Sequence, residues 1–204
     1  MIQRHDDVEG FILAGGQSAR MGGDKALLKL GGVPLLQHVT RRVEPLVARL
    51  TIVGPPDRYA AFGFRVIPDA RPRLGPLGGI ATALSHSAND WNLVVACDLP
   101  YLTAEWLDFL IVRAQASQAD VLLPQTAHGA EPLCAMYRTR CAAHIAGALQ
   151  RGVRKITEAL TGLTIDSIRP QQWKTFDSAG SLFKNMNTLA DYEEARARLE
   201  GARR

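Results

Sequence analysis

The sequence predicts an α/β fold with a mostly parallel β-sheet and helices on both faces. The prediction rests first on short apolar runs, which indicate buried strands, and second on intervening segments whose apolar residues recur at helical spacing. Apolar strands that alternate with amphipathic helices are typical of a parallel sheet covered on both sides. The length of 204 residues fits one domain, so residues 1–204 are expected to form a single unit.

The first strand is predicted at Val8–Ala14, an apolar run that ends in two glycines. Pro34 suits the first turn of a helix, and apolar residues then recur at helical spacing as far as Val47. Strands are expected next at 50–53 and 64–67.

The second half of the chain continues the alternation. A helix is predicted at 78–86, after a loop rich in proline and glycine, and a buried strand at 92–96. Thr103 is expected to cap the next helix, with Glu105 favourably placed near its positive end. The remaining predicted elements are strands at 121–123 and 133–137 and a helix at 189–199.

Composition limits the partners and the compartment. With 47% hydrophobic and 22% charged residues, the chain is expected to be an ordinary soluble globular protein. Its net charge of +4 includes arginines gathered at the C-terminal end, and no basic run interleaves with aromatics, so no nucleic-acid partner is expected. Three cysteines without zinc-type spacing favour a reducing cytoplasm. The polar N-terminus and the lack of an apolar run of ~18–20 residues argue against secretion and against a membrane span.

A glycine-rich loop follows the first predicted strand. Residues 13–25 hold four glycines together with Arg20 and Lys25. Glycines let backbone N–H groups approach phosphate oxygens closely, and the two cations can neutralise a triphosphate. The loop matches neither the P-loop pattern, because Ala26 follows Lys25, nor the dinucleotide fingerprint. We therefore predict a phosphate-binding loop of another kind, and a glycine-rich surface turn is the simpler alternative.

Two carboxylates follow predicted strands. Ligands in open α/β sheets bind beyond the carboxyl ends of the strands. The loops that follow Ala14, Val53, Ile67 and Ala96 should therefore share one crevice. Asp98 follows the strand at 92–96 and is a candidate Mg²⁺ ligand, since this ion takes one or two carboxylates together with phosphates and waters. Asp69 follows the strand at 64–67 and could hold the ribose or the metal. Either aspartate could instead be an ordinary turn residue.

Two further segments are candidates for ligand contacts. Gly75–Gly79 supplies a second glycine-rich approach, which could accommodate a base by backbone contacts or could simply start a helix. Residues 183–188 concentrate amides and a hydroxyl before the last predicted helix, where Asn187 or Thr188 could also serve as a cap. The histidines and cysteines show no metal-ligand spacing, and no Ser–His–Asp arrangement can be argued.

Taken together, these motifs closely resemble those of the molybdenum cofactor guanylyltransferases, which are nucleotidyltransferases with a Rossmann-like core. The resemblance runs through several segments in chain order and covers most of the chain. The chain departs from the family at two places, where Val53-Gly54-Pro55 replaces a frequent Asn and Leu189 replaces a frequent Pro. The segments that carry the resemblance are Leu13-Ala14-Gly15-Gly16, Arg20-Met21-Gly22-Gly23-Asp24-Lys25, Leu27-Leu28, Gly32-Val33-Pro34-Leu35-Leu36, Gly75-Pro76-Leu77-Gly78-Gly79, Cys97-Asp98-Leu99-Pro100, Glu131-Pro132-Leu133 and Asn185-Met186-Asn187-Thr188.

The resemblance implies transfer of GMP from GTP to the terminal phosphate of molybdenum-bound molybdopterin, with release of pyrophosphate and formation of the guanine dinucleotide. It also implies Mg²⁺ as cofactor, with bacterial molybdoenzymes or their chaperones as candidate partners. Arg20, Lys25 and Asp98 would be catalytic, and Asp98 would hold the Mg²⁺. Asn185 and Asn187 would lie toward the pterin. The implied contacts of GTP are Leu13, Ala14, Gly15, Gly16, Lys25, Val53, Asp69, Gly78 and Asp98.

An acceptor phosphate is already ionised at neutral pH, so its attack on the α-phosphorus of GTP needs no general base. We expect Mg²⁺ on Asp98 to bridge phosphate oxygens, Lys25 and Arg20 to stabilise the leaving pyrophosphate, and the backbone amides of Gly15 and Gly16 to hold the phosphates. Three alternatives stay open: a cytidylyltransferase for the same acceptor, a nucleotidyltransferase for a sugar phosphate, and a non-catalytic GTP-binding module that delivers the cofactor.

Overall fold

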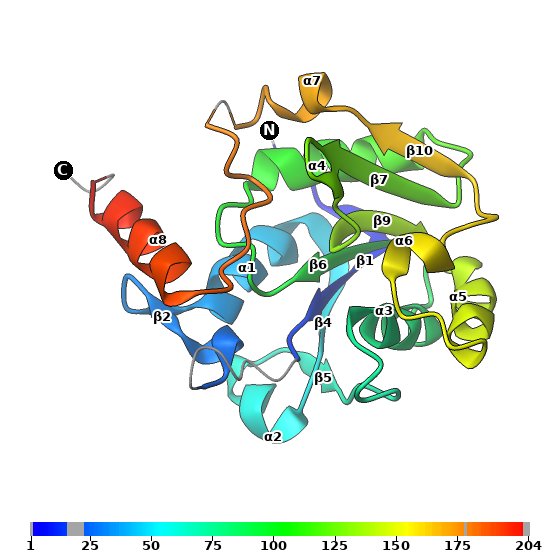
Figure 1. The fold of residues 1–204 in the computed structure, drawn as a ribbon, viewed down its shortest axis with the longest axis horizontal. Coiled ribbons are helices and arrows are strands. Elements are labelled where there is room, and N and C mark those ends of the chain that lie inside the picture. Colours follow the sequence, from blue (N-terminus) through cyan, green and yellow to red (C-terminus); the bar gives the residue numbers. More distant parts are fainter. Residues whose placement is uncertain (1, 16–22, 178, 202–204) are drawn as a thin grey trace.

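The computed structural model of the chain describes residues 2–15, 23–177 and 179–201. Most of its strands belong to one eight-stranded sheet (Figure 1). These strands are β1 (His5–Leu13), β4 (Val47–Val53), β5 (Arg65–Ile67), β6 (Trp91–Ala96), β7 (Val121–Thr126), β8 (Gly129–Ala130), β9 (Cys134–Arg138) and β10 (Ile165–Ile168).

The sheet is mostly parallel, as predicted. Its order is β10-β7-β9-β6-β1-β4-β5, and β8 pairs with β7 outside this row. β1 is parallel to β4 and to β6, β4 is parallel to β5, and β7 is parallel to β10. β9 is antiparallel to both of its neighbours, β6 and β7. The sequence did not predict this reversal, because a strand buried on both faces has the same apolar pattern in either direction.

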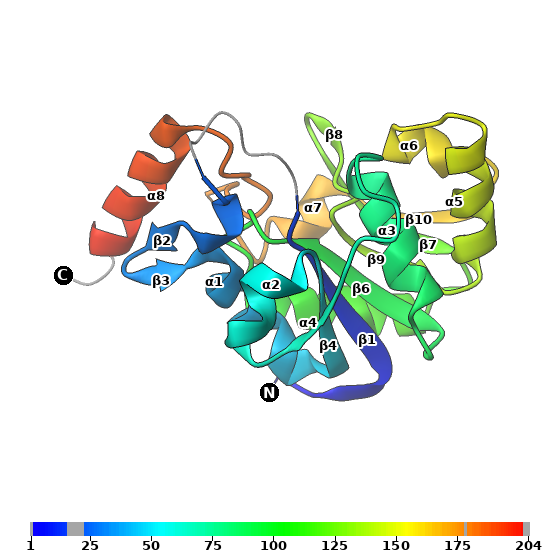
Figure 2. The same cartoon turned by 90° about the horizontal axis from the view of Figure 1, so that it is seen from below.

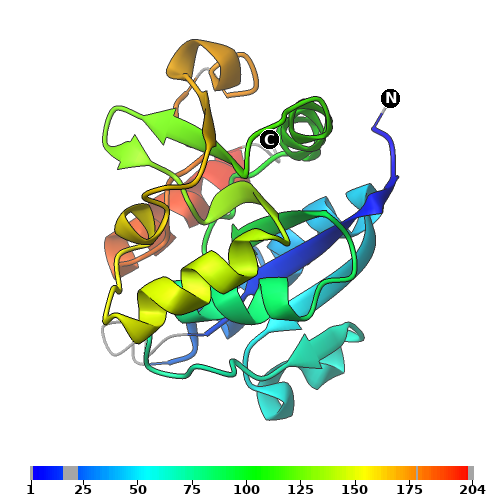
Figure 3. The ribbon, with the colours of Figure 1, turned by 90° about the vertical axis from the view of Figure 1, so that its right-hand side faces the viewer.

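Helices cover both faces of the sheet (Figure 3). Successive residues of β1 enter different apolar layers, since Ile12 packs in the layer on one face and Phe11 in the layer on the other. Each fully buried aliphatic or aromatic side chain of this size contributes about 1.5–3 kcal/mol to folding. The helices are α1 (Leu35–Val43) and α4 (Ala104–Gln115) on the face of Ile12, and α3 (Pro76–Ser85), α5 (Cys141–Gln150) and α6 (Ile156–Ala159) on the face of Phe11.

The helix predicted after Pro34 ends earlier than expected. α1 stops at Val43, and a 3-10 turn, η2 (Glu44–Leu46), leads directly into β4. Pro45 lies in that turn and has no N–H, so it cannot extend the hydrogen-bond ladder of the helix. The cap predicted for α4 is confirmed, because Trp106 N donates to Thr103 Oγ1 at 3.2 Å. None of the described helices is both long and apolar enough to cross a membrane.

A smaller layer lies beside the main sheet, at the left of Figures 1 and 2. The strands β2 (Lys29–Leu30) and β3 (Val33–Pro34) form a hairpin, and α8 (Leu189–Gly201) packs against it. Leu30, Leu35, Met186 and Ala195 form the apolar centre of this layer. The other short elements are η1 (Lys25–Leu27), α2 (Pro56–Tyr59), η3 (Ala60–Phe62) and α7 (Pro170–Trp173).

Candidate active site

The carboxyl ends of four parallel strands meet at one edge of the sheet, which we call the carboxyl edge. Leu13 pairs with Val53 on one side and with Ala96 on the other, and Val53 pairs with Ile67. The loops that follow these four residues therefore leave the sheet from a single row, as the sequence predicted. In Figure 2 this edge lies between α8 and α3.

Lys25 joins three segments of the chain at this edge. Its Nζ donates to Asp98 Oδ2 at 2.9 Å and to Asn187 Oδ1 at 2.7 Å. The side chains of Lys25 and Asp98 are each 18% exposed, so the ion pair is partly shielded from water but remains accessible. The structure thus brings together a predicted phosphate contact, a predicted metal ligand and a predicted pterin-side residue.

The segment that carries Asn187 is fixed against the loop after β6. Met186 N donates to Asp98 O at 3.0 Å, and the Met186 side chain is buried in the small layer. Asn185 and Asn187, on either side of it, are exposed. Thr188 caps α8, because its Oγ1 accepts from Asp191 N at 3.1 Å. Thr188, rather than Asn187, therefore caps α8, and the Asn187 side chain accepts from Lys25 instead.

Asp24 fixes the backbone just before Lys25. It caps η1 by accepting from Ala26 N at 3.1 Å. Tyr59 Oη donates to Asp24 Oδ2 at 2.8 Å, and Arg58 Nη1 lies 3.2 Å from the same oxygen. Burial, followed by the hydrogen bond to the Asp24 carboxylate, raises the pKa of the Tyr59 hydroxyl, so Tyr59 stays a neutral donor. Sequence reasoning missed this anchor, because no local pattern shows that α2 packs beside the loop.

Gly54 is a second position that sequence reasoning missed. Gly54 N donates to Ile67 O at 2.9 Å, and a Cβ at Gly54 would lie 2.1 Å from Ala14 O and 2.7 Å from the Tyr59 ring. No side chain fits in this space. The sequence signal that could have identified this position is the glycine directly after β4, in the segment where the chain departs from the family.

The predicted nucleotide contacts at the ends of β1 and β4 are largely buried. Leu13 O accepts from Cys97 N at 3.1 Å, and Ala14 N donates to Val53 O at 2.9 Å. These backbone groups therefore serve the sheet, and Gly15 is exposed just beyond them. Two of the predicted contacts, Gly16 and Arg20, lie outside the described residues.

Asp69 links the loop after β5 to α3. Its Oδ1 accepts from Thr82 Oγ1 and from Arg71 N, both at 2.9 Å. The carboxylate is thus already engaged in a turn, and Asp69 is not among the residues that Lys25 joins. Gly78 is buried in the first turn of α3, where a Cβ would lie 2.8 Å from Arg71 O.

The donors at the carboxyl edge suit a hard divalent cation. Asp98 offers a carboxylate and Asn187 an amide oxygen, which are the oxygen ligands that such ions prefer. Among the described residues, no three His, Cys, Asp or Glu side chains form a group that could hold a metal. Phosphates and waters would therefore complete the coordination. Burial and the neighbouring Asp98 raise the pKa of the Cys97 thiol, so the thiol is neutral beside Asp98.

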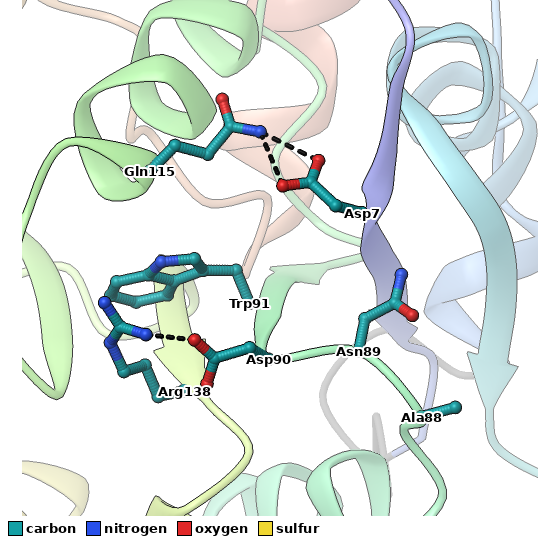
Figure 4. A pocket seen from close by; sticks show the side chains of 7 residues that line it. All are labelled: Asp7, Ala88, Asn89, Asp90, Trp91, Gln115 and Arg138. Atoms are coloured by element: carbon teal, nitrogen blue, oxygen red, sulfur yellow. Dashed lines mark hydrogen bonds and ion pairs between the residues drawn. The ribbon is translucent and has the colours of Figure 1, made fainter.

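A separate polar hollow of about 440 Å³ lies at the opposite edge of the sheet (Figure 4). Its polar side chains bind one another: Gln115 Nε2 donates to Asp7, and Arg138 pairs with Asp90. The Arg138 guanidinium also lies 4.4 Å from the centre of the Trp91 ring. Because these groups satisfy each other and none of the predicted site residues that the structure describes lies there, we do not assign the chemistry to this hollow.

This fold, with a glycine-rich loop after β1 and a lysine–aspartate pair at the carboxyl edge, is that of a nucleotide-binding α/β transferase. Residues 10–164 match the family described as the MobA-like NTP transferase domain, and the chain belongs to this family. It is a nucleotidyltransferase.

Individual relatives agree with this assignment. The chain is 33% identical to a molybdenum cofactor guanylyltransferase of Serratia proteamaculans, over 92% of this chain and 93% of the relative. It is 34% identical to a molybdenum cofactor guanylyltransferase of a Shewanella species, over 73% of this chain and 78% of the relative. The crystal structure of molybdopterin-guanine dinucleotide biosynthesis protein A from Archaeoglobus fulgidus superimposes with a TM-score of 0.84 and 26% identity, covering 95% and 99% of the two chains.

Proposed function

We propose that the chain transfers GMP from GTP to the terminal phosphate of molybdenum-bound molybdopterin, releasing pyrophosphate and forming the guanine dinucleotide. The observation that supports this most directly is the contact of Lys25 Nζ with both Asp98 and Asn187. In this contact Lys25 is suited to bind phosphate and Asp98 is suited to hold a metal. Asn187 supplies an amide from the segment before α8. The names of the relatives support the choice of nucleotide and acceptor.

The proposed reaction forms one P–O bond and breaks another. An oxygen of the acceptor phosphate attacks the α-phosphorus of GTP, and the bond from that phosphorus to the oxygen that bridges to the β-phosphate breaks. The electron pair of the broken bond leaves with pyrophosphate. Because the acceptor phosphate is already ionised at neutral pH, no side chain has to remove a proton. Catalysis then consists of positioning and of neutralising negative charge.

Lys25, Asp98 and Asn187 divide this work. Lys25 would turn from Asp98 toward the phosphates and stabilise the charge that develops on pyrophosphate, and Arg20 would be a second cation there. Asp98 would hold Mg²⁺, which supplies Lewis-acid neutralisation of the phosphate oxygens when it is bound. Asn187, together with Asn185, would face the acceptor.

The rest of the proposed nucleotide site lies on the side of β1, β4 and β5. Gly15 and Gly16 would donate backbone N–H groups to phosphate oxygens, which approach glycine closely. Asp69 would reach the nucleoside only through lone pairs that Thr82 and Arg71 leave free. The remaining proposed contacts are Leu13, Ala14, Val53 and Gly78.

Delivery of the product to molybdoenzymes or their chaperones is part of the same proposal, since a finished dinucleotide cofactor needs a recipient. The cytoplasmic location expected from the three cysteines stays a prediction.

The proposal is tested by measuring pyrophosphate release with Mg²⁺, molybdenum-bound molybdopterin and each of GTP, CTP and ATP. We expect release with GTP only, and a loss of about 10²-fold or more in Asp98→Asn. Asp6→Asn is the matched control, because Asp6 is 84% exposed near the start of β1. Preference for CTP would contradict the choice of nucleotide, and no release with any nucleotide would contradict catalysis and favour a binding module.

A further inference from the structure

Glu131 lies at the carboxyl edge, on the side of Asp98 away from the proposed nucleotide site. It precedes β9, and its N donates to Pro124 O at 2.9 Å, which fixes the turn from β8 into β9. Two residues on, Leu133 O accepts from Ala96 N at 2.8 Å, so this turn is tied to the end of β6. β9 and then β7 follow β6 on the side away from β1. Glu131 therefore borders the half of the carboxyl edge that lies away from the proposed nucleotide site.

The Glu131 carboxyl is half-buried, and few protein groups compensate for the water that it loses on burial. Thr126 Oγ1 donates to its Oε1 at 3.1 Å. Within the described part of the chain, Glu131 forms no ion pair with a lysine or arginine. Burial raises the pKa of this carboxyl, although Thr126 and the nearby His128 oppose the shift. A partly desolvated carboxyl held in place by its backbone is stabilised when N–H donors reach its second oxygen.

The chemistry of the proposed reaction limits which part of a substrate Glu131 can bind. Phosphate groups would be repelled by the Glu131 carboxylate, so it is suited to an uncharged part of a substrate that donates hydrogen bonds. A carboxylate pairs best with two adjacent N–H groups in one plane. The 2-amino-4-oxopyrimidine edge of a pterin presents such a pair. Guanine presents a similar pair, but the proposed nucleotide site lies on the other side of Asp98.

We propose that Glu131 is a specificity-determining residue that accepts hydrogen bonds from the 2-amino and N3–H groups of the pterin acceptor. This inference rests on the proposed function, because it assumes a pterin acceptor. Thr126 positions the carboxyl through one lone pair of Oε1, so Oε1 and Oε2 would each accept from one of the two N–H groups of the acceptor. A substrate with an oxo group in place of the 2-amino group would bring an acceptor instead of a donor to one carboxylate oxygen and is discriminated against.

Glu131→Gln tests the inference in the full chain, because it keeps the size of the side chain and a carbonyl oxygen for Thr126. We expect the KM for molybdenum-bound molybdopterin to rise about tenfold or more, while the affinity for GTP changes less than about twofold. Thr126→Val removes the hydroxyl partner and keeps the carboxylate, so it measures the structural cost of losing this hydrogen bond. Glu158→Gln is the matched control, because the Glu158 side chain is 62% exposed in α6, and it should change neither KM nor Tm. If Glu131 only holds the β7–β8 hairpin, Glu131→Gln and Thr126→Val lower Tm alike and neither raises the acceptor KM, which would overturn the inference.

A second measurement uses pterin and lumazine as competitors of the acceptor, because lumazine carries an oxo group in place of the 2-amino group. We expect the unaltered protein to bind pterin more tightly than lumazine and Glu131→Gln to lose the difference. Equal inhibition of the unaltered protein by both rings would overturn the inference. A failure of the proposed function is distinguishable, because the unaltered protein would then release no pyrophosphate from GTP and acceptor.

Discussion

Lys25 Nζ lies 2.9 Å from Asp98 Oδ2, so the proposed phosphate-binding cation and the proposed metal-binding carboxylate contact each other directly. If Asp98 holds a divalent cation as proposed, that cation and Lys25 would compete for the same carboxylate. Lys25 can leave Asp98 without an uncompensated charge only when a metal takes its place and phosphates receive the lysine. In the proposed mechanism, metal binding and nucleotide binding would therefore be coupled.

Lys25→Met is expected to tighten the binding of Mn²⁺ to the protein alone by several-fold, because Asp98 then lacks its internal cation. The same change is expected to lower turnover by about 10²–10³-fold, since a donor to the developing charge is lost. Electron paramagnetic resonance of Mn²⁺ measures the first effect, and pyrophosphate release the second. Lys29→Met removes an exposed lysine nearby and should change neither. Unchanged Mn²⁺ affinity in Lys25→Met would show that the ion pair does not control the metal.

Gly54→Ala is expected to destabilise the protein by about 3 kcal/mol, because its Cβ would lie 2.1 Å from Ala14 O, a backbone atom that cannot easily move. Gly15→Ala is the control, since a Cβ there would meet nothing within 4 Å. Thermal unfolding of both variants tests the difference. Equal Tm values for the two would contradict the close approach of Gly54 to Ala14.

Tyr59→Phe removes one buried donor from Asp24 and is expected to cost about 1–3 kcal/mol, because the remaining carboxylate is a charged group left partly unsatisfied. Turnover should fall as well, since Asp24 fixes the backbone that presents Lys25. Arg58→Ala removes the other side-chain partner of Asp24, but Arg58 is 56% exposed and its loss should cost less than about 1 kcal/mol. Denaturant unfolding with a turnover assay checks both, and a larger loss for Arg58→Ala would reverse the assignment of the anchor.

The strand ends of the carboxyl edge could be predicted from the sequence, because each apolar run is followed within two residues by glycine or aspartate. The contact of Lys25 with Asn187 could not, because the two residues are 162 positions apart and no local pattern encodes the meeting of distant segments. The contact of Tyr59 with Asp24 is of the same kind. The prediction that residues 1–204 form a single domain stays a prediction.

Among the elements that the sequence did not predict, α5 and β10 have physical reasons that their sequences explain. α5 consists largely of small residues, which give weak contrast between its buried and exposed faces. β10 is a four-residue strand at the edge of the sheet, and most of it is not fully buried. Its pairing with β7 begins beside Asp120, which accepts from Thr164 N at 2.8 Å and from Thr164 Oγ1 at 2.6 Å.

Asp120→Asn is therefore expected to loosen β10, at a cost on the order of 1 kcal/mol at neutral pH after solvent screening. The hydrogen bonds from Thr164, supported by Arg140, lower the pKa of Asp120 to about 2. A lowered pKa means that the ionised form stabilises the fold above the unfolded value near 4, and that this stabilisation is lost as the pH falls toward 2. The difference in unfolding free energy between the two proteins should shrink over that range. A difference that stayed constant from pH 5 to pH 2 would contradict this role.

The central claim, nucleotidyl transfer at the Lys25–Asp98 pair, is tested most directly by following phosphorus label from GTP. The protein is incubated with Mg²⁺, molybdenum-bound molybdopterin and GTP labelled either at the α- or at the γ-phosphate. The account predicts that α-label appears in the dinucleotide product and γ-label only in pyrophosphate, and that Asp98→Asn abolishes both. Transfer of γ-label to the acceptor, or α-label that stays in GTP, would contradict it.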